Sequence, residues 1–412
     1  MGAPRSNGPR ACGRTAPAGL ARSGALPLLP ALLALWLAPA LASDETDTFR
    51  LSASQALRYD SNLFRRSTGA RSETRSTTAA GVEFDKRYSL QRVELDANVA
   101  AHRYRSNDYL DFNALNYRAV WHWSLTPRLR GTLARTRSED INTFDYYRSF
   151  DRNVRTDHRT AGHAEAELGR DWHLLAGAEH QRRSNERPTA QDGDFTLRNL
   201  SAGVRRSFPS GSSISYRLLD GRGDYHNREP GEGFTPTSFD QREHELQLVW
   251  PMTGKTTLRA RLAHLERSHA GLPERDFSGP RGNLTLQWSA TAQVGLQFVL
   301  ARELSAYQTN TASYATNNRF ALNPYWTLSA RTTLYASLDH GRYSFGGALP
   351  GSTNAHSEDR KDRTNGAVLG VRWTPLDALS LRASLARERR SSNAEGFGYT
   401  NNAARVDATF AF

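Results

Sequence analysis

The chain has 412 residues, and its 54 Lys and Arg outnumber its 42 Asp and Glu, which gives a formal net charge of +12. Only 38% of the residues are hydrophobic, so a bundle of membrane-spanning helices is excluded, because just one stretch is apolar enough for a helix in lipid. The 8 Trp, 15 Tyr and 17 Phe are too many for a solvated disordered chain.

The N-terminus has the pattern of an export signal. Basic residues without acids come first, the apolar run Leu26–Leu41 follows, and Ala40-Leu41-Ala42 precedes Ser43. This order predicts a secretory signal peptide over residues 1–42, with 43–412 as the exported protein. An uncleaved N-terminal anchor is the alternative. Cys12 is the only cysteine and would leave with the signal, so we expect no disulfide and no Cys-based site.

From Phe49 onward, apolar and polar residues alternate. Val93, Leu95 and Ala97 alternate with charged neighbours, and the same pattern recurs over 117–123, 243–250, 293–300, 379–386 and 405–412. A period of two residues predicts β-strands with one apolar and one polar face.

Short and long connections between these strands take turns. The short ones carry turn residues, at 85–87, 126–128, 169–171, 209–211, 252–254, 289–291, 329–331 and 374–377, whereas long polar segments lie at 61–73, 140–156, 221–238 and 345–359. A sheet in lipid must close, because unpaired backbone groups cannot sit in hydrocarbon. The sequence therefore predicts an all-β fold, a single closed antiparallel transmembrane β-barrel of about 18 strands (16–18) of the outer-membrane type.

Aromatic residues mark one end of this barrel and the end of the chain. Seven of the eight Trp lie beside the short turns, as in an interfacial aromatic girdle: Trp121, Trp123, Trp172, Trp250, Trp288, Trp326 and Trp373. The last strand alternates and ends on Phe410 and Phe412. This ending resembles the recognition strand of bacterial outer-membrane proteins, so we expect both Phe residues to act as an assembly signal and the strand to close the barrel.

Catalytic and metal motifs are not found. The His residues lack metal-ligand spacing, and nucleotide-binding glycine loops and the nucleophile motif G-x-S-x-G do not occur. Asp192-Gly193-Asp194 fits a hairpin turn better than a calcium loop. We expect no enzyme, no cofactor and no metal, the alternative being a Ser, His and Asp site assembled at the rim from distant strands.

Arginine dominates the polar face. Lysine occurs only at 86, 255 and 361, and the candidate lumen-lining residues are Arg50, Arg92, Arg118, Arg205, Arg259, Arg261, Arg372 and Arg382. A ladder of guanidinium groups could guide an acidic polymer. Pairing with interior acids such as Glu94, Asp96, Glu243 and Glu245 is the alternative, and is slightly favoured. A nucleic-acid partner is not expected, because acids are interspersed with the basic residues.

Several segments carry a more specific resemblance. They are YDSNLFR (59–65), FDKRYSLQR (84–92), LTPRL (125–129), FPSGSS (208–213), WPMTGKTTL (250–258) and ERRSSN (388–393). In this order they resemble the EpsL-type outer-membrane β-barrel proteins encoded with exopolysaccharide-biosynthesis and exosortase/PEP-CTERM clusters, from about Leu51 to Phe412. The resemblance implies a role in exopolysaccharide production.

Three functions follow as hypotheses. The leading one is export of an exopolysaccharide across the outer membrane, with the polymer, periplasmic polysaccharide-export proteins, outer-membrane lipid and the outer-membrane assembly machinery as partners. The alternatives are a general or solute-specific porin for small anionic solutes, and a structural or adhesive surface barrel. A barrel of 16–18 strands is wide enough for an aqueous channel, as the first two require.

Overall fold

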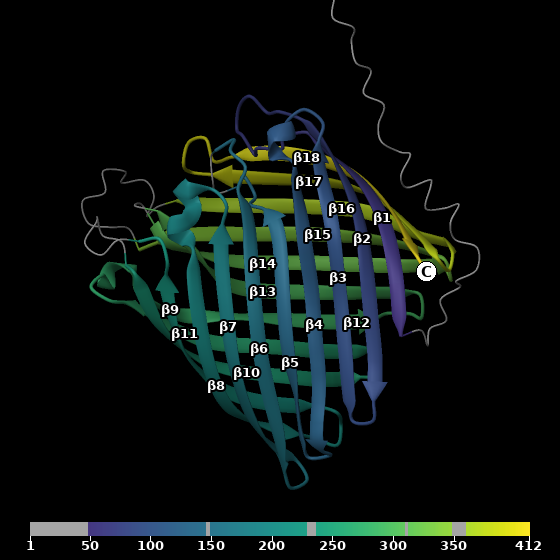
Figure 1. Cartoon of the computed structure of the whole chain (residues 1–412), viewed down its shortest axis with the longest axis vertical. Coiled ribbons are helices and arrows are strands. Elements are labelled where there is room, and N and C mark those ends of the chain that lie inside the picture. Colours follow the sequence, from purple (N-terminus) through teal and green to yellow (C-terminus); the bar gives the residue numbers. More distant parts are fainter. Residues whose placement is uncertain (1–47, 146–148, 229–235, 310–311, 348–359) are drawn as a thin grey trace, which may run out of the picture. The chain divides into compact units, whose positions relative to one another are not determined.

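The computed structural model describes residues 48–145, 149–228, 236–309, 312–347 and 360–412 (Figure 1). These residues form one sheet of 18 antiparallel strands and three short 3₁₀ helices. The strands are β1 Phe49–Asp60, β2 Glu73–Tyr88, β3 Gln91–Tyr104, β4 Phe112–Thr126, β5 Leu129–Ile141, β6 Val154–Leu168, β7 Trp172–Asn185, β8 Phe195–Ser207, β9 Ser213–Tyr225, β10 Ser238–Thr253, β11 Thr256–His269, β12 Phe277–Ser289, β13 Val294–Thr309, β14 Ala312–Ser329, β15 Thr332–Gly346, β16 Lys361–Leu376, β17 Leu379–Ser392 and β18 Tyr399–Ala411. The helices are η1 Asp108–Leu110, η2 Pro188–Gly193 and η3 Pro273–Arg275.

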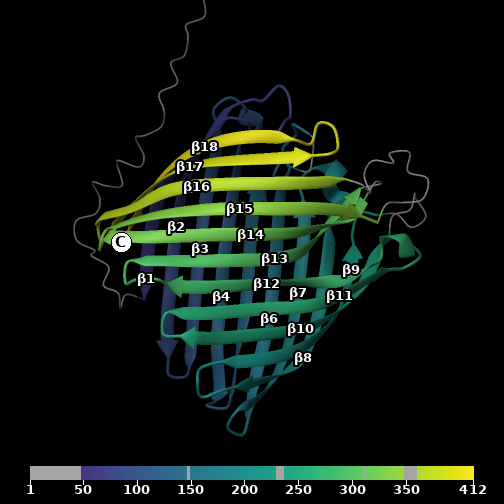
Figure 2. The same cartoon turned by 180° about the vertical axis from the view of Figure 1, so that it is seen from behind.

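The sheet closes into a barrel. Every strand pairs with its neighbours in sequence, and β1 pairs with β18 from Ser52↔Ala411 to Asp60↔Ala403 (Figure 2). The backbone N–H of Phe412 donates to Leu51 O at 2.9 Å, and Leu51 N–H donates to Phe412 O at 2.7 Å. The predicted closed barrel and the closing role of the last strand are confirmed. An assembly signal at Phe410 and Phe412 stays a prediction.

Connections at the two ends of the barrel differ in length. At one end, which we call the short-turn end, two to five residues join β2 to β3, β4 to β5 and so on to β17. At the other, the long-loop end, the longer connections include 61–72, 142–153 and 226–237. The predicted first turn is wrong by a few residues. Asp85 to Arg87 continue the ladder with β3, since Arg92 binds Asp85 across the strands, and the chain reverses at Ser89 and Leu90.

The outer surface carries an apolar band and a tryptophan girdle. Six of the seven predicted Trp point outward beside the short turns with 44–49% of their surface exposed, and Trp123 lies over Gly131 on the same face. Beyond the girdle, outward leucines such as Leu200, Leu262, Leu369 and Leu385 are 60–69% exposed. A closed barrel with this band, short turns and longer loops is an outer-membrane protein.

Two sequence predictions have a different status. The predicted signal peptide, residues 1–42, and Cys12 lie outside the described residues. Within the described part of the chain, none of the helices has the length and apolar character needed to cross a membrane.

Candidate functional site

The inner face of the barrel is identified by contacts that span it. Asp145 belongs to the loop between β5 and β6, yet its backbone oxygen accepts a hydrogen bond from Arg390 Nη1 of β17 at 2.7 Å. Tyr399 of β18 also donates to its carboxylate at 3.2 Å. Strands β1–β4 separate these partners along the wall, so the side chains of Arg390 and Tyr399 face the lumen. Successive residues of a strand face opposite sides of the sheet, so the register of each strand pair shows which residues of every strand face the lumen.

Three loops fill part of the lumen at the long-loop end. Phe64 of the β1–β2 loop, Leu110 of η1 and Phe144 of the β5–β6 loop are at most 8% exposed and form one cluster. The Phe64 ring lies 4.8 Å from the rings of Phe144 and Phe150. The wall beneath them is made of small inward residues, Ala79, Ala100 and Ala114, which face one another across β2, β3 and β4. These alanines leave the room that the loop side chains occupy.

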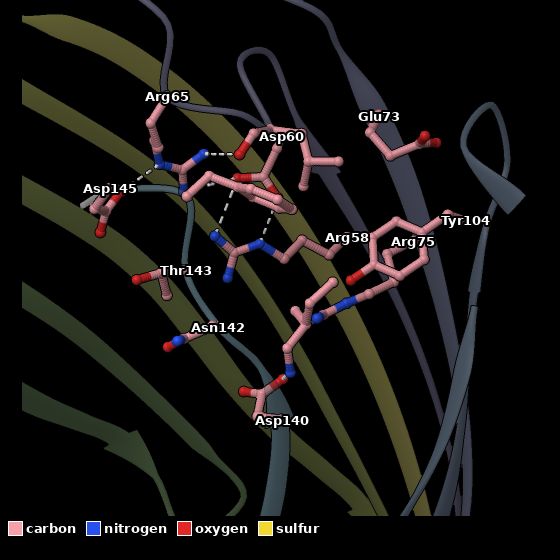
Figure 3. Close-up of a pocket in the computed structure, with 13 residues that line it drawn as sticks. Arg58, Asp60, Arg65, Glu73, Arg75, Tyr104, Asp140, Asn142, Thr143 and Asp145 are labelled. Atoms are coloured by element: carbon pink, nitrogen blue, oxygen red, sulfur yellow. Dashed lines mark hydrogen bonds and ion pairs between the residues drawn. The ribbon is translucent and has the colours of Figure 1, made fainter. Parts of the chain in front are cut away.

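Ion pairs fix the loops to the wall. Arg58 binds the Asp60 carboxylate with two nitrogens at 2.7 and 3.1 Å, and Asn401 of β18 donates to it at 2.8 Å. Arg65 lies between Asp60, at 3.4 Å, and Asp145, at 3.6 Å (Figure 3). Asp60 is 5% exposed. Because Arg65 and Asp145 come from different loops, their ion pair joins two loops and the β1–β18 seam.

These residues border a small cavity. It measures about 170 Å³ and is lined by Arg58, Arg65, Arg75, Asp60, Glu73, Asp140 and Asp145, with the Tyr104 ring at its edge (Figure 3). Arg58 contacts Asp60 directly, and Arg65 contacts Asp60 and Asp145, so these charges border the cavity as ion pairs.

A second tie holds the rim together. Arg152 Nε donates to Glu186 at 3.0 Å, and Arg152 Nη1 donates to Asp111 O at 2.8 Å, so three loops meet at one guanidinium. The hydrogen bond from Arg152 lowers the pKa of the Glu186 carboxyl, and the same bond raises the pKa of Arg152. The loop arrangement thus depends on an ionised carboxylate.

Further into the lumen, arginines share buried carboxylates. Glu243 and Glu245 of β10 are 4% and 5% exposed. Arg261 bridges both carboxylates, Arg281 binds Glu243 at 3.0 Å, and Arg217 binds Glu245 at 3.4 Å. Two carboxylates therefore hold three guanidiniums. The cluster keeps a positive charge on this part of the wall.

Guanidiniums also outnumber carboxylates around Glu165. Arg130 binds this carboxylate at 2.9 Å, Arg205 binds the same oxygen, and His173 lies 3.0 Å away. Arg130, Glu165 and Arg205 line a cavity of about 510 Å³ against the wall near the short-turn end. Glu94 is shared in the same way, by Arg92 at 3.0 Å and Arg118 at 3.2 Å.

All predicted lumen arginines lie on the inner face. Arg50, Arg92, Arg118, Arg205 and Arg261 pair with acids, as the slightly favoured interpretation predicted. Arg259 instead donates to Gln287 at 2.6 Å. Arg372 and Arg382 oppose each other across β16 and β17, both exposed, and the structure gives neither an ion pair within the described residues. A role in selecting solutes stays a prediction for these residues.

Sequence reasoning missed the loop residues that narrow the lumen. Phe64 and Arg65 lie in the loop after the first strand, and Asp145 lies in another polar loop, so none of the three positions had an alternating pattern to assign it. The aromatic residues at 64, 144 and 150 in otherwise polar loops were the available signal. In the described residues, His, Cys, Asp and Glu form no group of three that could hold a metal ion, and Asp194 instead accepts hydrogen bonds from Asn185 at 2.8 Å.

Comparison with solved structures identifies the fold. The chain is similar to the outer membrane protein OpdK from Pseudomonas aeruginosa, with 11% identity, a TM-score of 0.51, and coverage of 88% of this chain and 99% of that one. OpdK with vanillate matches at 12% identity and a TM-score of 0.51, over 88% and 99% of the two chains. OccK2 (OpdF) of the same organism matches at 14% identity and a TM-score of 0.50, over 88% of this chain and 98% of that one. No protein-family model and no curated protein matches the sequence.

Proposed function

We propose that the barrel is a passive outer-membrane channel for small anionic solutes. The observation that carries this proposal is a lumen narrowed by inserted loops and lined by more guanidiniums than carboxylates at Glu165 and at the Glu243–Glu245 cluster. The loops that enter the lumen at the long-loop end reduce the space left for a solute, which favours small molecules over a polymer.

The arrangement of arginines suits carboxylates. A guanidinium binds a carboxylate through two parallel N–H bonds and stays charged at every physiological pH. Arg259, Arg372, Arg382 and the Glu165 cluster lie toward the short-turn end, while the Glu243–Glu245 cluster lies deeper, so an anion meets several weak sites in succession. Conduction needs sites that are easy both to enter and to leave. The similar fold of OpdK, whose structure with vanillate holds a small carboxylate, supports the same solute class.

Ion selectivity in planar bilayers tests the proposal. In a salt gradient, the reversal potential of the purified barrel should show selectivity for anions. Replacing Arg259, Arg372 and Arg382 together by Gln should shift the selectivity toward cations. The matched control is Arg182→Gln, on the outward face of β7. A channel without conductance, or one that prefers cations before any substitution, would contradict the proposal.

Exopolysaccharide export, which the sequence resemblance implies, is the second candidate. One observation favours a saccharide. Tyr325 and Tyr335 oppose each other on the inner face, and a Cβ on Gly295 or Gly370 would come within 2.4 Å of their rings, so each ring lies flat along the wall. Tyr325 is 46% exposed. The C–H groups of a sugar can stack on such a ring face.

A deletion strain distinguishes the two candidates. If the barrel exports a polymer, the strain should retain polysaccharide in the periplasm, and Tyr325→Ala with Tyr335→Ala should reproduce part of that defect. If it is a solute channel, secreted polysaccharide should stay at wild-type levels, while uptake of small anions should fall.

A further inference from the structure

A basic patch lies on the outside of the barrel, away from the pore. We call it the outer basic patch, and it consists of Arg302 on β13, Arg342 on β15, Lys361 and Arg363 on β16, and Arg387 and Arg389 on β17, all of them exposed. Its members share the parity of the exposed Leu300, Leu338, Leu369 and Leu385, which places them on the outward face.

The patch begins at the edge of the apolar band and extends toward the long-loop end. Arg302 and Arg387 each follow an outward leucine of the apolar band by two residues, Leu300 and Leu385, in the direction of the long-loop end. Long loops of outer-membrane barrels face the cell exterior. The patch therefore lies where the hydrocarbon of the outer leaflet ends and its headgroups begin.

No acid among the described residues is paired with a member of the patch. Arg342 and Arg363 are directly opposite in the β15–β16 register, an arrangement in which like charges repel. Arg302 donates to Pro280 O and to Asn318, which are neutral groups. None of the described outward-facing residues of β13–β17 is an acid.

Arginines at the same end of β8–β10 behave differently. Arg198 and Arg222 both pair with Asp224, at 3.7 and 3.5 Å, and Arg242 pairs with Asp220 at 3.1 Å. Each of these outward arginines therefore has an acid partner within the sheet itself. Arg135 on β5 and Arg182 on β7 are also outward and have no ion pair among the described residues, but the outer basic patch gathers six basic residues on neighbouring strands.

We propose that the outer basic patch binds the phosphate groups of lipopolysaccharide, the phosphorylated glycolipid of the outer leaflet. Guanidiniums bind phosphate through paired N–H bonds, and basic clusters beside a membrane recognise anionic headgroups. The lipid's acyl chains would lie against the outward leucines, and its phosphates would bridge Arg342 and Arg363, removing their repulsion. This inference does not depend on what the pore conducts.

Lipid retention tests the proposal. The barrel is purified from outer membranes in mild detergent, and lipopolysaccharide retained per barrel is measured by mass spectrometry. Replacing Arg302, Arg342, Arg363 and Arg389 by Gln should lower retention at least about tenfold, since each basic group near an anionic surface adds binding energy. The matched control replaces Arg198, Arg222 and Arg242 by Gln and should retain the lipid. Equal retention by wild type and the patch variant would overturn the proposal.

Two further measurements identify the ligand and do not depend on folding of the variant. Wild-type barrel is offered bisphosphorylated lipopolysaccharide and its dephosphorylated form; only the first should bind, and binding should weaken at high salt. Binding of both forms alike would overturn the role of phosphate. Native mass spectrometry that finds a protein or a second barrel on the patch, instead of the lipid, would overturn the lipid assignment. Heat-modifiable migration on gels verifies that the variants are folded.

Discussion

Two sets of arginines on the same sheet meet different surroundings. On the inner face, Arg217, Arg261 and Arg281 surround two buried carboxylates, and each makes at least one ion pair. On the outer face of β13–β17, Arg342 and Arg363 stand opposite each other with no acid among their described outward neighbours. The residue type is identical, so the presence of carboxylates decides what each set can do.

This difference distinguishes arginines that hold the wall together from arginines that are available to bind another molecule, which we call receptive. A guanidinium held by a buried carboxylate fixes the wall and adds only part of its charge to the lumen field. A guanidinium without a partner keeps its binding capacity for something outside the chain. By that criterion Arg372 and Arg382 are receptive residues of the lumen, and the outer basic patch is a receptive surface outside.

The largest effect is expected from breaking the inner set. Glu243→Gln with Glu245→Gln leaves three guanidiniums without a counter-charge, and should lower the free energy of barrel unfolding by about 3 kcal/mol. Urea unfolding in lipid vesicles, followed by Trp fluorescence, measures it. Glu266→Gln is the control, because Glu266 is outward and its side chain is 58% exposed. A loss no greater than that of the control would show that these pairs do not hold the wall.

Position along the outer face should decide the cost of an added arginine. Leu248→Arg places a charge in the apolar band and should lower the free energy of barrel unfolding by about 2–4 kcal/mol. Gln247→Arg places the charge in the lumen and should lower it little. Thr316→Arg, at the height of the outer basic patch, should also be tolerated. The same unfolding assay ranks the three. Equal costs at 247 and 248 would contradict the assignment of the two faces.

Most of the fold could be predicted because its determinants are local. Alternation in stretches such as 293–300 assigns both faces of a strand, and turn residues such as Pro127 and Gly211 mark reversals. The same alternation placed all of the candidate lumen arginines on the inner face. The turn at Ser89 was misplaced, since Asp85-Lys86-Arg87 has the composition of a turn yet pairs with β3.

The site itself was less predictable because its contacts join distant residues. Asp145 meets Arg390 and Tyr399, roughly 250 positions away in the chain, and no periodicity encodes such a contact. The outer basic patch was missed for another reason. Treating the outward face as apolar throughout ignored that Arg363 and Arg387 keep the parity of Leu369 and Leu385, a signal that the sequence does contain.

The smallest effect is expected from lowering the pH. Acid should affect the loops held by the paired Arg152 but not the outer basic patch, whose arginines have no acid partner among the described residues. Arg152 holds the pKa of Glu186 below its usual range, so the tie between the loops is complete above the ordinary glutamate pKa and is lost as pH falls through the lowered value. Single-channel current should therefore become noisier or larger only at strongly acidic pH. Glu186→Gln should show that behaviour already at neutral pH, because its amide cannot ionise.

The outer basic patch offers the contrasting response to the same acid. It contains no carboxylate to protonate, so lipopolysaccharide retention should stay constant from pH 7 to about pH 4, over which the lipid phosphates keep at least one negative charge. Measuring current and retained lipid on the same preparation distinguishes the two regions. Lipid loss that parallels the change in channel current would mean that both depend on one loop arrangement, and would contradict the separation of paired and receptive arginines.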